Sequence, residues 1–135
     1  MPPTVPRLGH ALIDGQHQRI QLAAKRFLAA ARRGRGRPEL TALIRASTRN
    51  FASEERLMRA SRYPLRAGHI SLHQGILADM HRLRSNLRQR AVPHRALVAQ
   101  AVDWLAHHAD EADRRLVGHL AMYRPARRRL ATRRN

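Results

Sequence analysis

The sequence predicts an all-α protein, in the form of an up-down-up-down four-helix bundle. Apolar residues recur every three to four positions in four long stretches, which is the period of an α-helix with one buried face. Short breaks containing glycine or proline separate these stretches. No stretch alternates apolar and polar residues for long enough to indicate a β-strand. Long helices of comparable length joined by short loops are typical of such a bundle.

The first two helices are expected on either side of an arginine- and glycine-rich break. The first covers about residues 13–31, with Asp14 as its N-terminal cap. The stretch RRGRGRP, residues 32–38, ends this helix because glycine and proline are poor helix residues. The second helix covers about residues 38–62, and Pro38 suits its first position, where no backbone N–H is needed.

Two proline-containing breaks define the remaining helices. Tyr63-Pro64 ends the second helix, and a third is expected over about residues 65–90. Val92-Pro93 ends the third, and a fourth is expected over about residues 93–120. Gly118 lies near the end of this fourth helix, where glycine is common.

The chain therefore divides into a helical bundle over residues 1–120 and a basic tail, or short C-terminal helix, over residues 121–135. The last thirteen residues, YRPARRRLATRRN, include six arginines. The whole chain has 27 basic and 9 acidic residues and a net charge of +18, and Lys25 is its only lysine. Such a charge attracts nucleic acid and other polyanions. A biased genome composition explains the arginine excess equally well, so both interpretations stay open.

Composition excludes several classes of function. The chain has no cysteine, which excludes disulfides, thiolate metal sites and cysteine nucleophiles. The opening MPPTVPRLGHALID lacks the apolar segment of a signal peptide, and no apolar run approaches the roughly 20 residues of a membrane span. We therefore expect a cytoplasmic protein without membrane insertion. No Ser–His–Asp arrangement or phosphate-binding loop is evident, so we expect a binding protein and not an enzyme.

Residues of the types that bind metals interrupt all four apolar faces. A polar group buried there without a partner costs about 1–3 kcal/mol. His69 and His73 are four apart, which places both on one face of a helix. His108 and Asp113 are five apart, about 140° around an α-helix, so helical phase alone does not pair them. The interrupting residues are four imidazoles and two carboxylates: His17, Glu54, His69, His73, His108 and Asp113.

The combination of these residues is more informative than any one of them. With nine histidines in the chain, chance alone supplies about half a pair at this spacing, and a single histidine is more often a surface or core residue. Imidazole together with carboxylate, however, suits iron, manganese or zinc. Two bridging carboxylates in a helical bundle suit a pair of metals.

Four stretches carry these residues: LGHALIDGQHQRI (8–20), FASEERLM (51–58), YPLRAGHISLH (63–73) and WLAHHADEADRRL (104–116). Together they touch every expected helix and span nearly the whole chain. Their order and intervals resemble those of the bacterial hemerythrins, a family of single-domain, non-haem di-iron bundles that bind dioxygen. The resemblance implies a four-helix bundle that holds two irons and serves in oxygen carriage, storage or sensing.

The resemblance also implies a role for each residue. Three histidines would bind one iron: His69, His73 and His108. His17 would bind the other iron, which takes dioxygen, while Glu54 and Asp113 would bridge the pair and an oxo or hydroxo group would complete the bridge. The walls of the oxygen pocket would be Ile20, Phe51, Leu105 and Ala109. His107 and Glu55 lie one residue from ligand positions, and we interpret them as neighbours of the site.

Asn50 departs from the family pattern, which has a histidine four residues before the bridging glutamate. An amide oxygen is a harder and weaker ligand for ferrous iron than an imidazole. Three outcomes stay open. Both irons bind, with Asn50 or water as the seventh ligand; or the second iron binds weakly, which leaves a mostly mononuclear centre; or the site is degenerate and binds no metal usefully. Two alternative functions follow: a metal-poor basic bundle that binds polyanions, and an iron-dependent oxidase or peroxide-handling enzyme.

Overall fold

The computed structural model describes residues 5–87 and 94–124. Within these ranges the prediction of an all-α chain is confirmed, because they contain four long helices and no strand. The helices are α1 (Ala11–Arg32), α2 (Arg37–Ala60), α3 (Arg66–Asn86), and a composite fourth helix of α4 (His94–His108), a π-helical turn (Ala109–Asp113) and α5 (Arg114–Met122).

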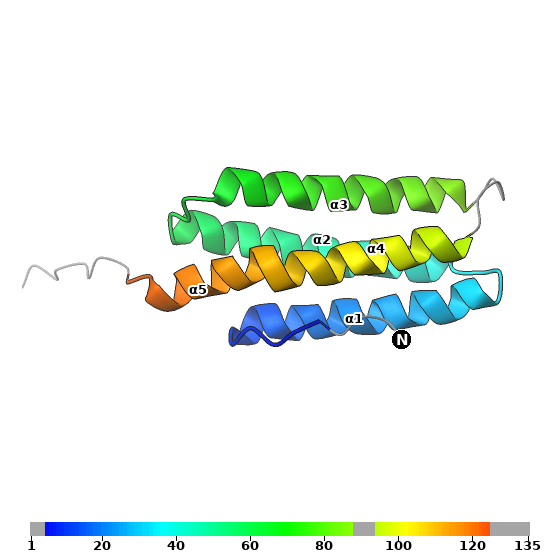
Figure 1. Cartoon of the computed structure of the whole chain (residues 1–135), viewed down its shortest axis with the longest axis horizontal. Coiled ribbons are helices and arrows are strands. Elements are labelled where there is room, and N and C mark those ends of the chain that lie inside the picture. The colour runs from blue at the N-terminus through cyan, green and yellow to red at the C-terminus, as the bar shows by residue number, and fades with distance from the viewer. Residues whose placement is uncertain (1–4, 88–93, 125–135) are drawn as a thin grey trace, which may run out of the picture.

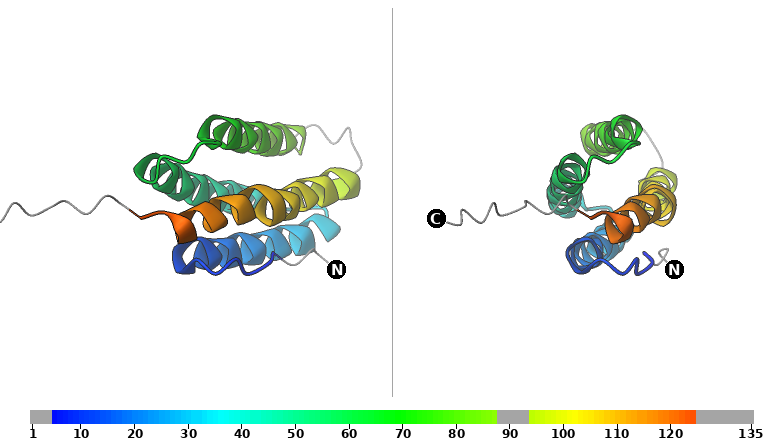
Figure 2. Two further views of the ribbon diagram at one scale, coloured as in Figure 1. Left: turned by 60° about the vertical axis from the view of Figure 1, so that its left-hand side comes forward. Right: turned by 90° about the vertical axis from the view of Figure 1, so that its left-hand side faces the viewer.

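The four helices lie alongside one another, and each runs in the opposite direction to the helix before it (Figure 1). The end-on view shows them grouped around a common axis (Figure 2, right). Every helix can therefore present one face to a shared interior. Side chains from distant parts of the sequence meet there at the same level.

The start of α1 differs from the sequence prediction. The cap is His10, whose Nδ1 accepts a hydrogen bond from the Ile13 N–H at 3.4 Å, and the helix begins at the next residue. Asp14 lies inside the first turn. Its carboxylate accepts the backbone N–H groups of Leu8 and Gly9 at 2.8 and 3.0 Å. The expectation that Asp14 is the cap was therefore wrong, because its side chain holds the preceding segment instead.

The turn between α1 and α2 depends on two glycines with positive φ. Gly34 has φ of +70° and Gly36 has φ of +139°, which L side chains rarely adopt. A Cβ atom on Gly36 would also lie only 3.1 Å from the ring of Phe27, which is fully buried. Pro38 follows in the first turn of α2, as expected from its missing N–H.

The Tyr63-Pro64 break lies where the sequence predicted it. α2 ends at Ala60, and the Tyr63 N–H then donates to the Met58 carbonyl at 2.9 Å. The expected break at Val92-Pro93 lies outside the described residues, as does most of the expected basic tail. Among the residues that are described, no helix has the length and apolar character needed to cross a bilayer.

The interior consists of two apolar clusters. The larger one lies toward the α1–α2 turn and includes Phe27, Leu40, Leu43, Met80 and Leu105. The smaller one lies toward the α2–α3 turn and contains Ile13, Met58, Tyr63, Leu116 and Val117. On each helix the buried residues between the two clusters are mainly polar, so a polar layer divides the core. This layer contains the candidate site.

Candidate metal centre

Each helix contributes to the polar layer. α1 supplies His17, α2 supplies Glu54, α3 supplies His69 and His73, and the fourth helix supplies His108 and Asp113. All six expected ligands are at most 6% exposed: His17, Glu54, His69, His73, His108 and Asp113. Four imidazoles and two carboxylates buried in one layer form a group that an apolar interior tolerates only if the members satisfy one another or a bound ion.

The π-helical turn explains how His108 and Asp113 come together. In an α-helix, residues five apart point about 140° away from each other. A π-helix has i→i+5 hydrogen bonds, so residues five apart lie on nearly the same face. The turn covers Ala109–Asp113, and His108 Nε2 lies 3.0 Å from Asp113 Oδ1. An angle of 100° per residue misplaces this pair because the segment has the wider winding of a π-helix.

Both oxygens of Glu54 face histidines, in two directions. Oε2 lies 2.9 Å from His73 Nε2 and 3.3 Å from His69 Nε2. Oε1 lies on the other side, 3.5 Å from His17 Nε2. The carboxylate is fully buried, so these imidazoles are its polar surroundings.

The two oxygens of Asp113 also face histidines in two directions. Its Oδ1 lies 3.0 Å from the Nε2 atoms of both His69 and His108, while Oδ2 lies 2.9 Å from His17 Nε2. Each carboxylate thus offers one oxygen to a group of three histidines and the other oxygen to His17. Five members of the layer have ligand atoms within 4.8 Å of one another and could hold a metal ion: Glu54, His69, His73, His108 and Asp113.

The ligand atoms satisfy one another only in part, through the hydrogen bonds of His69 Nε2 and His73 Nε2 with Glu54 Oε2. Four other ligand atoms are buried without a hydrogen-bond partner: His17 Nε2, Glu54 Oε1, His108 Nε2 and Asp113 Oδ1. Leaving such atoms unsatisfied costs about 1–3 kcal/mol each. Coordination of a cation would satisfy them, and imidazole with carboxylate is a ligand set used for iron, manganese and zinc. The residues therefore fit a metal centre.

The histidines and carboxylates of the layer shift one another's pKa values. Burial alone would lower the pKa of His17 and of His69, but the carboxylates of Asp113 and Glu54 outweigh burial and raise both pKa values to about 9. Burial alone would raise the pKa of Glu54, whereas the histidines around it lower this pKa to about 2. The pKa of Asp113 is likewise held well below its ordinary value, against burial, by histidines that include His108. Two carboxylates thus stay ionised inside the core.

Two neighbours fix the ring of His73. Its Nδ1 lies 3.2 Å from Glu55 Oε1, while Phe51 stacks on the ring with 3.9 Å between centroids and an angle of 8°. A ligand histidine commonly donates its second N–H to a carboxylate, which orients the ring. From the sequence, Glu55 was expected beside the site, but this contact was not predicted. The signal that could have revealed it was a second carboxylate next to Glu54, opposite two histidines on one helix face.

His107 lies away from the layer. Its side chain is 71% exposed and pairs with Glu111 at 3.2 Å. His119 lies in a different region, where its Nε2 donates to the Ser61 carbonyl at 2.9 Å. This exposed side chain agrees with the interpretation of His107 as a neighbour of a ligand position and not a ligand itself.

A small cavity of about 10 Å³ lies against His17. On this scale a single water needs about 10–15 Å³, so the space suits one very small molecule. The four residues expected to wall an oxygen pocket all line it: Ile20, Phe51, Leu105 and Ala109. Asn50 and Asp113 line it as well, and so does Val5 from the segment before α1, which nothing in the sequence indicated.

Asn50 is 1% exposed and reaches the layer from α2. Its Nδ2 donates to Gln16 Oε1 at 3.1 Å, while its Oδ1 is buried without a hydrogen-bond partner. Gln16 and Ser53, which are both buried, did not emerge from the sequence, because nothing marks a glutamine or serine as part of a site before its neighbours are known.

Comparison of the chain with protein-family models, curated proteins and solved structures gave no match. The functional interpretation therefore depends on the arrangement of the residues themselves.

Proposed function

We propose that the protein is a non-haem iron protein that binds dioxygen at a di-iron centre in an up-down-up-down bundle of hemerythrin type. The observation that supports this proposal is the way in which the two oxygens of each carboxylate face different histidines. Glu54 and Asp113 each turn one oxygen to the three histidines and the other oxygen to His17. Two carboxylates divided in this way supply bridging ligands for two ions.

The two metal positions would differ in their protein ligands. One has three imidazoles, from His69, His73 and His108, together with an oxygen of each carboxylate. The other has His17 and the remaining carboxylate oxygens, with Asn50 nearby. When bound, a pair of ferrous ions would supply the electrons for reversible binding of dioxygen.

The cavity beside His17 supports binding of a small molecule over processing of a larger one. Five of its lining residues are apolar, and its volume of about 10 Å³ excludes organic substrates. Carriage, storage and sensing of oxygen are all consistent with this enclosure. The oxidase or peroxidase alternative requires turnover, so loss of peroxide consumption in Glu54→Ala would favour it over simple binding.

Iron counting together with optical spectroscopy tests the proposal. We expect up to two irons per chain after anaerobic loading, and an oxygen-dependent charge-transfer band that disappears when oxygen is removed. Asn50→His should increase occupancy of the second position and lengthen the life of the oxygen complex, because imidazole is the better ligand for ferrous iron. Absence of both iron and the band in the natural chain would contradict the proposal.

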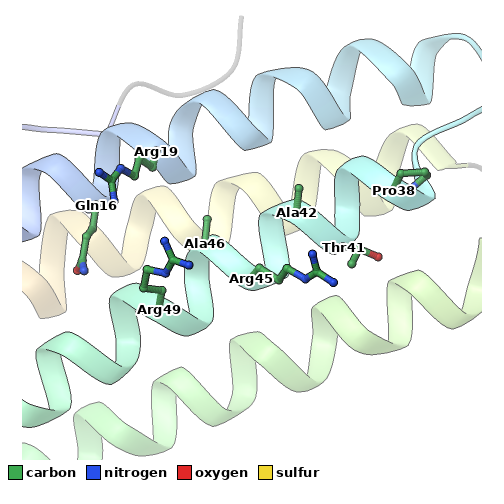
Figure 3. Close-up of a pocket in the computed structure, with 8 residues that line it drawn as sticks. All are labelled: Gln16, Arg19, Pro38, Thr41, Ala42, Arg45, Ala46 and Arg49. Carbon is green, nitrogen blue, oxygen red and sulfur yellow. The ribbon is translucent and has the colours of Figure 1, made fainter.

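A groove between α1 and α2 favours a second candidate function, the binding of anions or polyanions. It has a volume of about 280 Å³ and is lined by Arg19, Arg45 and Arg49 (Figure 3). Their side chains project around the space between the two helices. Together with the net charge of +18, this groove offers concentrated positive charge on one face of the bundle.

Binding of single-stranded and duplex oligonucleotides at several salt concentrations tests this candidate. We expect the double variant Arg45→Gln/Arg49→Gln to bind more weakly and to lose part of the salt dependence. Arg66→Gln/Arg82→Gln removes the same charge from exposed positions elsewhere and serves as the control. Equal weakening by both variants would show only nonspecific attraction to the net charge.

A further inference from the structure

The side-chain hydroxyl of Ser53 has all of its hydrogen-bonding capacity in use. It donates to the backbone carbonyl of Arg49 at 3.1 Å, and that carbonyl can only accept. It accepts from the Arg56 guanidinium at 3.3 Å, and that group can only donate. The third contact, 2.8 Å to Gln16, must therefore be one in which Ser53 accepts. The nitrogen of the Gln16 amide is thus required to face Ser53.

The orientation of Gln16 determines the orientation of Asn50. With its nitrogen toward Ser53, Gln16 presents Oε1 to Asn50 and accepts from Asn50 Nδ2 at 3.1 Å. Gln16 extends from α1 toward α2 beside Arg49 (Figure 3). The only remaining polar atom of Asn50 is Oδ1, which is buried, unpartnered and on a residue that lines the cavity with His17. The amide cannot turn over without breaking this sequence of hydrogen bonds.

We propose that Ser53 and Gln16 are positioning residues that present Asn50 Oδ1 as the fourth protein ligand at the His17 metal position, and that this oxygen-rich position accepts a hard divalent cation such as Mn²⁺. The inference deepens the proposed function, since it takes the centre to hold two ions. The ligands there are one imidazole nitrogen and three oxygens, from Glu54, Asp113 and Asn50. Oxygen ligands of this kind suit manganese.

The two positions should therefore fill with different metals. The position with three imidazoles suits ions such as zinc, which bind nitrogen-rich sites more tightly than Mn²⁺ in the usual order of affinities. The position at His17 has one imidazole and three oxygen ligands, so the advantage of zinc over Mn²⁺ should be smaller there. Sequential addition of Zn²⁺ and then Mn²⁺ distinguishes the positions without any measurement of oxygen chemistry.

The experiment begins with metal-free protein, adds one equivalent of Zn²⁺, and then titrates Mn²⁺ while following the electron paramagnetic resonance signal of the free ion. We expect the natural chain to bind one Mn²⁺ after the first Zn²⁺. Gln16→Leu and Ser53→Ala should weaken Mn²⁺ binding by about 10–100-fold, the usual effect of losing a residue that orients a ligand. Their Zn²⁺ affinity, measured by calorimetry, should stay unchanged and shows that each variant is folded.

Two further variants separate orientation from packing. Gln16→Glu keeps an acceptor facing the Asn50 nitrogen, and the Ser53 hydroxyl can turn from the Arg49 carbonyl to donate to the new carboxylate, so this variant should retain Mn²⁺ binding. Gln18→Leu changes an exposed glutamine on the same helix and should behave like the natural chain. Asn50→His should increase the advantage of a second Zn²⁺ over Mn²⁺ because it replaces an oxygen by an imidazole nitrogen.

The outcomes distinguish this inference from the proposed function. Normal Zn²⁺ binding with unchanged Mn²⁺ affinity in Gln16→Leu and Ser53→Ala would overturn the inference and leave the metal centre standing. Failure of the natural chain to bind even one equivalent of Zn²⁺ would contradict the metal centre itself. Equal losses in Gln16→Glu and Gln16→Leu would show that shape, and not the direction of the hydrogen bond, matters at position 16.

Discussion

At the scale of single residues, His73 shows how the polar layer holds its ligands. Glu54 lies at one ring nitrogen, Glu55 at the other, and Phe51 covers one face of the ring. The ring therefore has little freedom to rotate within the core. A ligand held in this way loses less entropy when an ion binds, which favours tight binding.

Glu55→Ala should weaken binding at the position with three histidines. The substitution removes the carboxylate at His73 Nδ1, and loss of such a partner usually lowers metal affinity by about 10–100-fold. Competition titration with a Zn²⁺-binding dye measures the effect. Glu111→Ala is the matched control, because Glu111 also pairs with a histidine but at the exposed His107. Equal affinities in the two variants would show that Glu55 does not support the site.

The difference between the six expected ligands and their partners shows what sequence can reveal. Histidine and carboxylate on an apolar face are conspicuous, because their burial needs an explanation. Gln16, Ser53 and Val5 have no such signature. Their contribution depends on rotamers and on the approach of another helix, neither of which the local sequence encodes.

At the scale of helices, periodicity predicted the elements well and their ends less well. The second helix was expected to end two residues beyond Ala60, and the first to begin two residues after Ala11. Capping depends on side-chain contacts such as that of His10, which compete with the more familiar cap at Asp14. The π-helical turn was not predicted, because a constant angle of 100° per residue assumes one winding throughout a helix.

The glycines of the helices and turns should respond to alanine in opposite directions. Gly36→Ala should lower the free energy of unfolding by about 1–3 kcal/mol or more, because of its positive φ and the nearby ring of Phe27. Gly75→Ala should raise it by roughly 0.5–1 kcal/mol, since Gly75 lies within α3 with nothing within 4 Å of an added Cβ. Chemical denaturation measures both.

Gly34→Ala separates the two causes at Gly36. It shares the positive φ, at +70°, but an added Cβ there has no neighbour within 4 Å. We therefore expect a smaller loss of stability than for Gly36→Ala. A loss as large as that of Gly36→Ala would mean that backbone conformation alone, and not contact with Phe27, sets the cost.

At the scale of the whole molecule, the buried cluster couples stability to pH. In the folded, metal-free chain His17 and His69 have pKa values near 9, above their ordinary value of 6.5. Their contribution is complete below pH 6.5 and is lost as pH rises through about 9. The pKa of Glu54 is about 2, below its ordinary value of 4.5, so its contribution is present above pH 4.5 and is lost as pH falls through about 2.

The metal-free protein should therefore melt at progressively lower temperature as pH rises from 6.5 to 9. Added Zn²⁺ should raise the melting temperature by an amount that grows over the same range, because the ion must displace protons from histidines. His17→Gln removes one of the two groups and should reduce the slope of the metal-free curve. A melting temperature that is constant between pH 6.5 and 9 would contradict this linkage.

The polar layer between the two apolar clusters also affects how the molecule unfolds. Without an ion, the smaller cluster around Met58 and Leu116 is joined to the larger one through a layer of polar side chains, several of whose atoms have no hydrogen-bond partner. That end of the molecule can then open as a separate unit while the larger cluster stays folded. An ion held by ligands from all four helices would couple the two units. Metal binding would thus convert two partly independent folding units into a single cooperative one.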